Sequence, residues 1–251
     1  MVFFRITGGL LGLLVETLYW CKASFSNSEK VFAQLYIIGN QTLPVGALIA
    51  LFSGGVLALQ AGPTLAQFGL EENVGGLVGL SLVKEIGPIM ASILIAGRVG
   101  SAMTAELASM SVYEEIDALK TMDINPVRYL VMPRFIATVI ALPVLVIYMD
   151  VIGWYGGAVV SVVNPEVHLS FDVYYRNLSE LVDFTAVMNG LIKAMFFGVI
   201  ISIVSCYVGL KTKGGPREIG SSVTKAVVMS FVLVLVSDYY ITRILLFLNL
   251  D

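Results

Sequence analysis

Five long runs of apolar residues divide the chain, and each is long enough to form a helix that crosses a lipid bilayer. They cover about residues 43–61, 74–109, 133–163, 184–210 and 223–248. A bilayer core needs about 20 consecutive, mostly apolar residues in a helix. The pattern predicts an all-α polytopic membrane protein with a five-helix transmembrane domain at residues 43–251.

A shorter apolar run precedes these five. It extends from Ile6 to Trp20 and is flanked by Arg5 and Lys22. Its length falls below that of a span, and its aromatic end suits the boundary between lipid and water. We therefore expect residues 1–42 to form an interfacial region with a helix lying along the cytoplasmic surface. The alternative is a poor first transmembrane helix.

Prolines and glycines predict where the spans are interrupted. Gly62-Pro63 is expected to end the first span, and Gly87-Pro88 to break the second, because proline lacks a backbone donor and clashes with the preceding turn. The residues between the third and fourth spans, 164–183, are polar enough to be an outer loop.

Composition supports a membrane protein and limits its chemistry. Of 251 residues, 57% are hydrophobic and 13% charged, more apolar surface than a soluble domain of this size could bury. Cys21, Cys206 and the single histidine, His168, suggest neither a disulfide framework nor a metal site. The chain has no Walker A motif, so we expect no cofactor, no catalytic residue and no ATP hydrolysis by the chain itself.

The lysines and arginines are distributed unevenly among the loops. Ten of the 15 lie in the N-terminal region, between spans two and three, or around the turn between spans four and five. The opposite loops contain only Arg176. Cytoplasmic loops carry the excess of basic residues, so the N-terminus is predicted to be cytoplasmic and the C-terminus to lie outside.

Four charged residues are predicted to share one depth inside the membrane. Lys84 and Glu85 lie in the second span, Lys193 in the fourth and Asp238 in the fifth. With a helical rise of 1.5 Å per residue, each lies roughly 15 Å from the outer surface. Isolated charges there are costly, which favours mutual pairing or a wet cavity. We interpret them as a polar path for a lipid headgroup; the alternative is an ion-pair network that only holds helices together.

Three further charges within spans, Arg98, Asp150 and Arg243, have roles that the sequence leaves open. Arg98 lies near the inner surface, where a long side chain can reach water.

A polar amphipathic segment follows the second span. Ser111 and Glu114 have the spacing of a capping box, and Glu115 adds charge to the first turn. An apolar face recurs at helical spacing. The pattern predicts a cytoplasmic coupling helix between spans two and three, at about residues 111–124, that docks on a partner. Its expected coupling residues are Ser111, Val112, Glu114, Glu115, Ile116 and Leu119.

The stretch KEIGPIMASILIAGRVGSAMTAELASM, followed by EEIDALKTMDINPVRYLVMPR, resembles the signature of the MlaE (YrbE-like) permeases. The resemblance covers most of the chain from about residue 40. It implies the membrane subunit of an ABC system that moves phospholipid or a related lipid between membranes. Family members carry charges matching Lys84, Glu85, Lys193 and Asp238, although many have arginine at the first of these positions, where bidentate phosphate recognition would differ.

The same resemblance implies the partners. These are a homodimeric second copy, a separate cytoplasmic ABC ATPase that binds ATP and Mg, and an MCE-domain lipid-binding protein on the outer side. A bacterial inner membrane is the expected location, and no nucleic acid is expected. The rival functions are an ion-coupled secondary transporter and a non-transporting scaffold subunit. The absence of repeated halves argues against the first rival, and the lipid species and direction of transport stay open.

Overall fold

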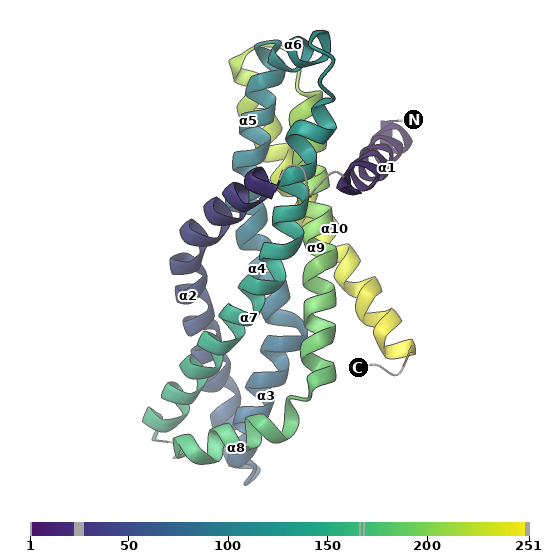
Figure 1. Cartoon of the computed structure of the whole chain (residues 1–251). Coiled ribbons are helices and arrows are strands. Elements are labelled where there is room, and N and C mark those ends of the chain that lie inside the picture. Colours follow the sequence, from purple (N-terminus) through teal and green to yellow (C-terminus); the bar gives the residue numbers. More distant parts are fainter. Residues whose placement is uncertain (1, 23–27, 166, 168, 249–251) are drawn as a thin grey trace. The chain divides into compact units, whose positions relative to one another are not determined.

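The computed structural model describes residues 2–22, 28–165, 167 and 169–248. All regular secondary structure in these residues is helical (Figure 1). Within the same residues, five helical segments are long and apolar enough to cross a membrane, and a shorter apolar helix, α1 (Val2–Trp20), precedes them. The all-α fold with five candidate spans is therefore confirmed. The predicted loop residue His168 lies outside the described residues.

The chain forms two compact units. The first contains Met1–Asn40, Ser92–Leu142 and Met195–Ser237. The second contains Gln41–Ala91, Pro143–Ala194 and Asp238–Asp251. The predicted division of the chain at residue 42 is not tested by these units and stays a prediction.

The first span is longer than predicted, because Gly62-Pro63 does not end it. Helix α2 runs from Ser28 to Gln67 with Pro44 and Pro63 inside it. It stops at Gly69, whose φ of 70° is left-handed. There the Gly69 N–H donates to the Ala66 carbonyl (3.0 Å) and the Leu70 N–H to the Leu65 carbonyl (2.9 Å). This is a Schellman motif, and it terminates the helix where a single lost proline donor did not.

The second span is helical throughout instead of being broken at Gly87-Pro88. It consists of α3 (Val74–Ser81), α4 (Gly87–Ile95) and α5 (Ser101–Val112), joined by π-helical turns at Leu82–Ile86 and Ala96–Gly100. The first π-helical turn comes directly before Pro88. A π-bulge inserts an extra residue into the helical turn. The helix thus accommodates the proline by widening the preceding turn, and the predicted break is corrected to a bulge.

The remaining elements follow in order. They are α6 (Glu115–Thr121), a π-helical turn at Val127–Val131, α7 (Met132–Val163), α8 (Phe171–Leu181), α9 (Phe184–Lys211) and α10 (Pro216–Phe247). Helices α7, α9 and α10 match the third, fourth and fifth predicted spans.

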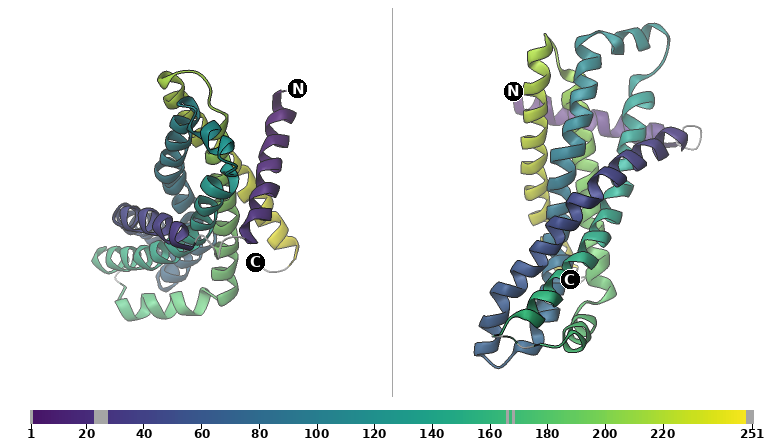
Figure 2. Two further views of the ribbon diagram at one scale, coloured as in Figure 1. Left: turned by 45° about the horizontal axis from the view of Figure 1, so that its top comes forward. Right: turned by 90° about the vertical axis from the view of Figure 1, so that its left-hand side faces the viewer.

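Helix α8 replaces most of the predicted outer loop. Its cap is Ser170, whose hydroxyl accepts a hydrogen bond from the Val173 N–H at 3.3 Å. Tyr174 and Leu178, one turn apart, are buried. The helix packs against α3, and the left view of Figure 2 shows α8 lying crosswise to α9, the helix that follows it. An amphipathic helix therefore covers one end of the second unit.

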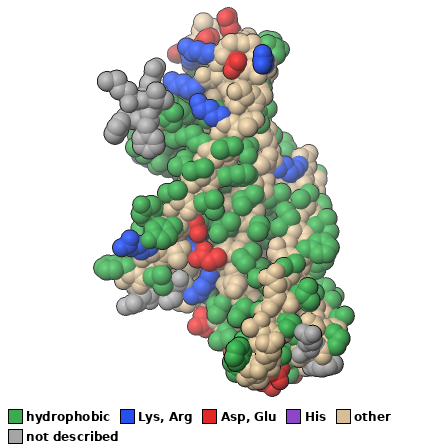
Figure 3. All heavy atoms as spheres, turned by 180° about the vertical axis from the view of Figure 1, so that it is seen from behind, with side chains coloured by type: hydrophobic (Ala, Val, Ile, Leu, Met, Phe, Trp, Pro, Cys, Tyr) green, Lys and Arg blue, Asp and Glu red, His purple; other side chains and the backbone are tan. Residues whose placement is uncertain are grey.

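Helices α2 and α7 touch backbone to backbone within the second unit. A Cβ atom at Gly54 would collide with the Gly153 carbonyl, and one at Gly156 would collide with the Leu51 carbonyl. Small residues permit this approach between membrane helices. Hydrophobic side chains predominate over the middle of the face shown in Figure 3, and a small group of acidic and basic side chains lies among them.

Candidate functional site

Lys193 on α9 forms ion pairs with carboxylates of two other spans in the second unit. Its side chain is 2% exposed, and Nζ lies 2.6 Å from Glu85 Oε1 and 3.4 Å from Asp238 Oδ1. These groups come from the second, fourth and fifth spans, which the depth argument placed at one level. The structure confirms that they pair. Their role in transport stays a prediction. We call Glu85, Lys193 and Asp238 the charge cluster.

Lys84 contributes its backbone to the charge cluster. The Lys193 ammonium donates a hydrogen bond to the Lys84 carbonyl at 2.9 Å. In an α-helix that carbonyl would accept from the N–H four residues later, but this position is Pro88, which has none. The proline thus leaves a carbonyl available to a side chain from another span. Gly87-Pro88 therefore helps to build the site, although it does not break the helix.

Thr242 is a member of the site that sequence reasoning missed. Its hydroxyl lies 2.9 Å from the Asp238 carbonyl and 3.3 Å from Glu85 Oε1, and its single proton can serve one of them at a time. The available signal was its position four residues after Asp238, which places both on one face of α10.

The cation of the charge cluster is buried, whereas one of its two carboxylates is partly exposed to solvent. Lys193 is almost fully buried, whereas the side chains of Glu85 and Asp238 are 38% and 16% exposed. Two carboxylates share one ammonium, so Asp238 Oδ1 lies beyond hydrogen-bond geometry and has no such partner among the described residues. A further cationic or hydrogen-donating group could therefore be received from the exposed side of Glu85.

Asp150 lies on α7 in the same unit. It is 5% exposed, and its Oδ1 has no hydrogen-bond partner within the described residues. A Cβ at Gly87 would collide with that oxygen. The hollow beside it measures about 10 Å³, which is about the space of one water molecule. The position is too small for a lipid and explains why Gly87 has no side chain.

The predicted capping box of the coupling segment is wrong. Ser111 is still inside α5, and its hydroxyl donates to the Thr212 carbonyl at 2.8 Å. The residue at the N-cap position of α6 is Glu114, which has a left-handed φ of 60° and makes no side-chain cap hydrogen bond. Helix α5 extends one turn further than the sequence suggested, because Ser111 has a partner across the unit. Glu115 and Asp117 nevertheless supply acidic charge in the first turn of α6.

The apolar face of the coupling segment is covered by the protein itself. Ile116 is 7% exposed and packs with Leu107 and Val127, and Leu119 packs against the same cluster. This corrects the expectation that Ile116 faces a partner. The exposed side chains of the segment include Tyr113, Glu114 and Glu115 between α5 and the start of α6, and Met122 at the end of α6. Val112 is partly buried. The coupling role of the segment stays a prediction.

An ion pair in the first unit was also missed by the sequence analysis. Arg134 Nη2 lies 2.7 Å from Glu106 Oε1, and Nη1 donates to the Leu130 carbonyl at 2.6 Å. Arg134 was not among the charges singled out from the sequence; it lies in the first turn of α7 and is 5% exposed. Within the described residues, no group of three or more His, Cys, Asp or Glu side chains is placed to hold a metal ion.

Comparison with known proteins agrees with this architecture. The family model described as "Permease MlaE" matches residues 31–244. A probable ABC transporter permease protein of Rickettsia typhi is 42% identical over 215 residues, covering 86% of this chain and 82% of the relative. The intermembrane phospholipid transport system permease protein MlaE of Haemophilus influenzae is 36% identical over 214 residues, covering 84% and 81%.

A plant protein is also similar. The chloroplastic protein TRIGALACTOSYLDIACYLGLYCEROL 1 of Arabidopsis thaliana is 35% identical over 211 residues, covering 83% of this chain and 59% of the relative. The residues that the family model matches include the spans that carry the charge cluster. On the strength of a family match across most of its length, the chain belongs to the MlaE permease family.

Proposed function

We propose that this chain is the membrane-spanning permease subunit of an ABC transporter that moves phospholipid or a related lipid between membranes. Family membership and the phospholipid transport named for the Haemophilus relative support this proposal. The observation that carries it is the charge cluster, in which Lys193 on one span bridges Glu85 and Asp238 on two others. Ionisable groups within spans mark substrate pathways more often than not.

The charge cluster offers what a lipid headgroup needs inside the bilayer. A phosphate group moved into hydrocarbon loses its hydration, and this cost falls if protein charges replace water. The buried Lys193 ammonium holds the Glu85 carboxylate in place, and the exposed side of that carboxylate can attract an amine of a zwitterionic headgroup. Lys84 adds a further cation beside Glu85. In this proposal the chain supplies a path and no catalytic group.

The energy would come from a separate cytoplasmic ABC ATPase that binds ATP and Mg. We place its docking surface at the exposed residues on both ends of α6, Tyr113, Glu114 and Glu115 at its start and Met122 at its end, since Ile116 is packed within the unit. The excess of basic residues supports a cytoplasmic N-terminus and a periplasmic C-terminus in a bacterial inner membrane. An MCE-domain protein would bind on the outer side.

A second copy of the chain would complete the permease. Among the candidate spans in the described residues, α10 and α2 are the least buried. Their exposed apolar faces are the surface that we propose for contact between the two copies, since apolar surface on a span can be covered by protein as well as by lipid.

Charge reversal at Glu85 tests the proposed path. Glu85→Arg would place three cationic side chains against Asp238, which should trap an anionic headgroup or close the path. We expect lipid transfer to be abolished while insertion and ATPase association persist. Glu72→Arg, the same reversal at an exposed position, is the matched control. Abundance, ATPase association and transfer are measured in one preparation.

The outcomes separate the competing functions. Normal transfer by Glu85→Arg would rule out the charge cluster as the lipid path. Low protein yield with normal transfer per molecule would indicate a purely structural network. Transfer that needs no nucleotide, with no ATPase in the purified complex, would favour a secondary transporter.

A further inference from the structure

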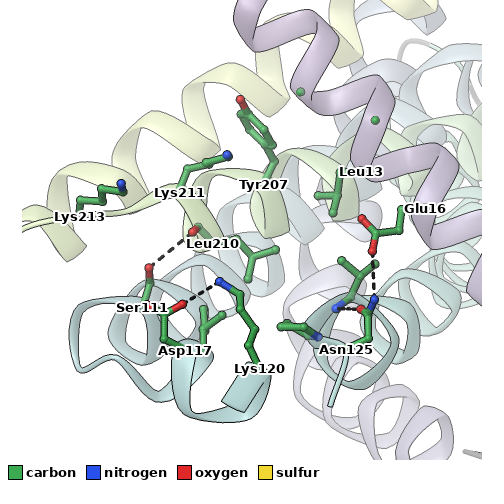
Figure 4. A pocket seen from close by; sticks show the side chains of 15 residues that line it. Leu13, Glu16, Ser111, Asp117, Lys120, Asn125, Tyr207, Leu210, Lys211 and Lys213 are labelled. Carbon is green, nitrogen blue, oxygen red and sulfur yellow. Dashed lines mark hydrogen bonds and ion pairs between the residues drawn. The ribbon is translucent and has the colours of Figure 1, made fainter. Parts of the chain in front are cut away.

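A hollow of about 620 Å³ opens in the first unit beside α6, as the close view in Figure 4 shows. Its walls come from three places: α1, the segment from α5 to Val127, and the end of α9. The volume is in the range of small-molecule sites. The hollow contains no residue of the charge cluster, so it is not part of the proposed transport path.

Side chains of both charges line the hollow, with one more cation than anion. In Figure 4, Lys120 and Asp117 lie on the α6 side, and Lys211 and Lys213 lie on the α9 side. Lys120 Nζ lies 2.7 Å from Asp117 Oδ1. The fifth charge is Glu16, which accepts a hydrogen bond from the Asn125 amide at 3.2 Å.

The two lysines of the α9 side are the groups available to a ligand. Lys120, with a smaller contribution from Lys213, holds the pKa of Asp117 below its usual value. Neither Lys211 nor Lys213 lies within 4.0 Å of a carboxylate oxygen among the described residues. Two ammonium groups on one wall of a concave site attract an anion, and lysine is a common phosphate binder.

The third wall of the hollow belongs to a helix with an apolar outer stripe. Leu11, Val15 and Leu18 of α1 recur at spacings of three and four residues and are 59%, 67% and 52% exposed. Such a stripe is stable in contact with lipid. The inner side of the same helix presents Gly12 and Leu13 to the hollow. The hollow therefore combines apolar and cationic lining beside a helix suited to the membrane surface.

Contacts elsewhere on α1 hold this wall in place. The Arg128 guanidinium lies over the Trp20 ring, 5.3 Å from its centroid, which is within the range of a cation–π interaction. At the other end, Tyr207 of α9 packs directly on Gly9, where a Cβ would collide with the ring. The wall is thus fixed on both sides of Gly12.

From this arrangement we propose that the hollow binds an anionic phosphate group. Lys211 and Lys213 form its cationic wall, and Gly12 in the α1 wall leaves room for the phosphate because it has no side chain. The phosphate can come from a lipid headgroup at the membrane surface or from a soluble phosphate. Binding would connect α1 to α6 and α9 at a site separate from the proposed transport path. The proposal does not depend on which lipid is transported.

The test measures binding of dihexanoyl phosphatidylglycerol to the full chain in a neutral detergent by native mass spectrometry. The double variant Lys211→Gln/Lys213→Gln should weaken the dissociation constant at least tenfold. Arg217→Gln is its matched control, because it removes a charge from the same basic turn without lining the hollow. This control should bind within twofold of the unaltered protein.

A steric pair tests the hollow without changing any charge. A Cβ at Gly12 or at Gly8 meets nothing within 4 Å, but only Gly12 lines the hollow. Gly12→Leu should fill it and weaken binding at least tenfold, whereas Gly8→Leu should not. Competition by millimolar inorganic phosphate would identify a soluble phosphate as a sufficient ligand. Binding that resists this competition would identify the lipid headgroup.

Three results would overturn the proposal. The first is equal weakening by Arg217→Gln and by the double variant, which indicates diffuse attraction to the basic turn. The second is unchanged binding by Gly12→Leu. The third is equal affinity for phosphatidylglycerol and for phosphatidylcholine, whose headgroup has no net charge.

Discussion

Lys193→Met removes the one cation of the charge cluster while keeping an unbranched side chain of similar length. It leaves Glu85 and Asp238 without their shared ammonium, and it removes the donor to the Lys84 carbonyl. Breaking a buried ion pair from one side costs about 3–5 kcal/mol. Because the Glu85 side chain is 38% exposed, water screens part of this loss, and we expect the lower end, about 3 kcal/mol.

This loss is large enough to measure. It corresponds to a change of roughly 100-fold in the ratio of folded to unfolded protein. For a chain of this length it should lower the thermal midpoint by about 6–12 °C. The assay is thermal unfolding of the purified chain in detergent, followed by size-exclusion chromatography, with lipid transfer measured on the reconstituted complex.

A charge-free triple variant separates stability from function. Lys193→Met/Glu85→Gln/Asp238→Asn removes the repulsion and leaves neutral groups, and such replacements of buried ion pairs are often neutral for stability. We expect its thermal midpoint to return to within about 3 °C of the unaltered protein by the same scaling, with transfer still lost. If the triple variant is as unstable as Lys193→Met, or if Lys193→Met unfolds normally, the electrostatic reasoning is refuted.

Three further predictions concern other parts of the chain. Ile116→Asp should destabilise the first unit by about 3 kcal/mol, because it buries a carboxylate in an apolar cluster, whereas the exposed Tyr113→Asp should keep the thermal midpoint and reduce ATPase co-purification. Gly54→Val should lower folded yield, since its side chain would collide with Gly153 on α7, and fluorescence-detected size exclusion measures this. Ser170→Ala should cost about 1 kcal/mol through loss of the α8 cap, which should appear as faster amide hydrogen exchange at the start of that helix.

Each of these has an outcome that would contradict it. A normal midpoint for Ile116→Asp would mean that α6 does not pack where the structure places it. Full ATPase binding by Tyr113→Asp would move the docking surface elsewhere. Normal folding of Gly54→Val would exclude close contact between α2 and α7, and unchanged exchange in Ser170→Ala would exclude the cap.

The sequence predicted the spans well because their signal is local. An apolar run of sufficient length defines a span wherever its neighbours lie, so α7 and α9 appear within one residue of their expected bounds. The pairing of Lys193 with Glu85 and Asp238 was also predictable, because the helical rise converts residue numbers into depth. A common depth in three spans needs no knowledge of which helices are neighbours.

Prediction from the sequence failed for features that depend on which distant residues pack against a segment. The spacing of Ile116 and Leu119 shows that a helix has an apolar face, but not whether the same chain or a partner covers it. Ser111 has the sequence spacing of a capping box, but its hydroxyl donates a hydrogen bond to the Thr212 carbonyl instead. Helix α8 had a local signal that was overlooked, because Tyr174 and Leu178 recur at helical spacing after the cap Ser170, and the polar residues between them were interpreted as a loop.

The glycine contacts between α2 and α7 limit the motions open to a transporter. Residues on one face of a helix recur every three to four positions, so sliding α7 by one turn, about 5.4 Å, in one direction would bring Met149 or Asp150 to the place where Gly153 now meets Gly54. Neither side chain fits between two backbones in contact, so lengthwise slippage in that direction is blocked. In the other direction Gly156 or Gly157 would take that place, so the glycines leave one direction of sliding open. A rearrangement that opens or closes a lipid path in this unit can use that direction or the contacts of other helices.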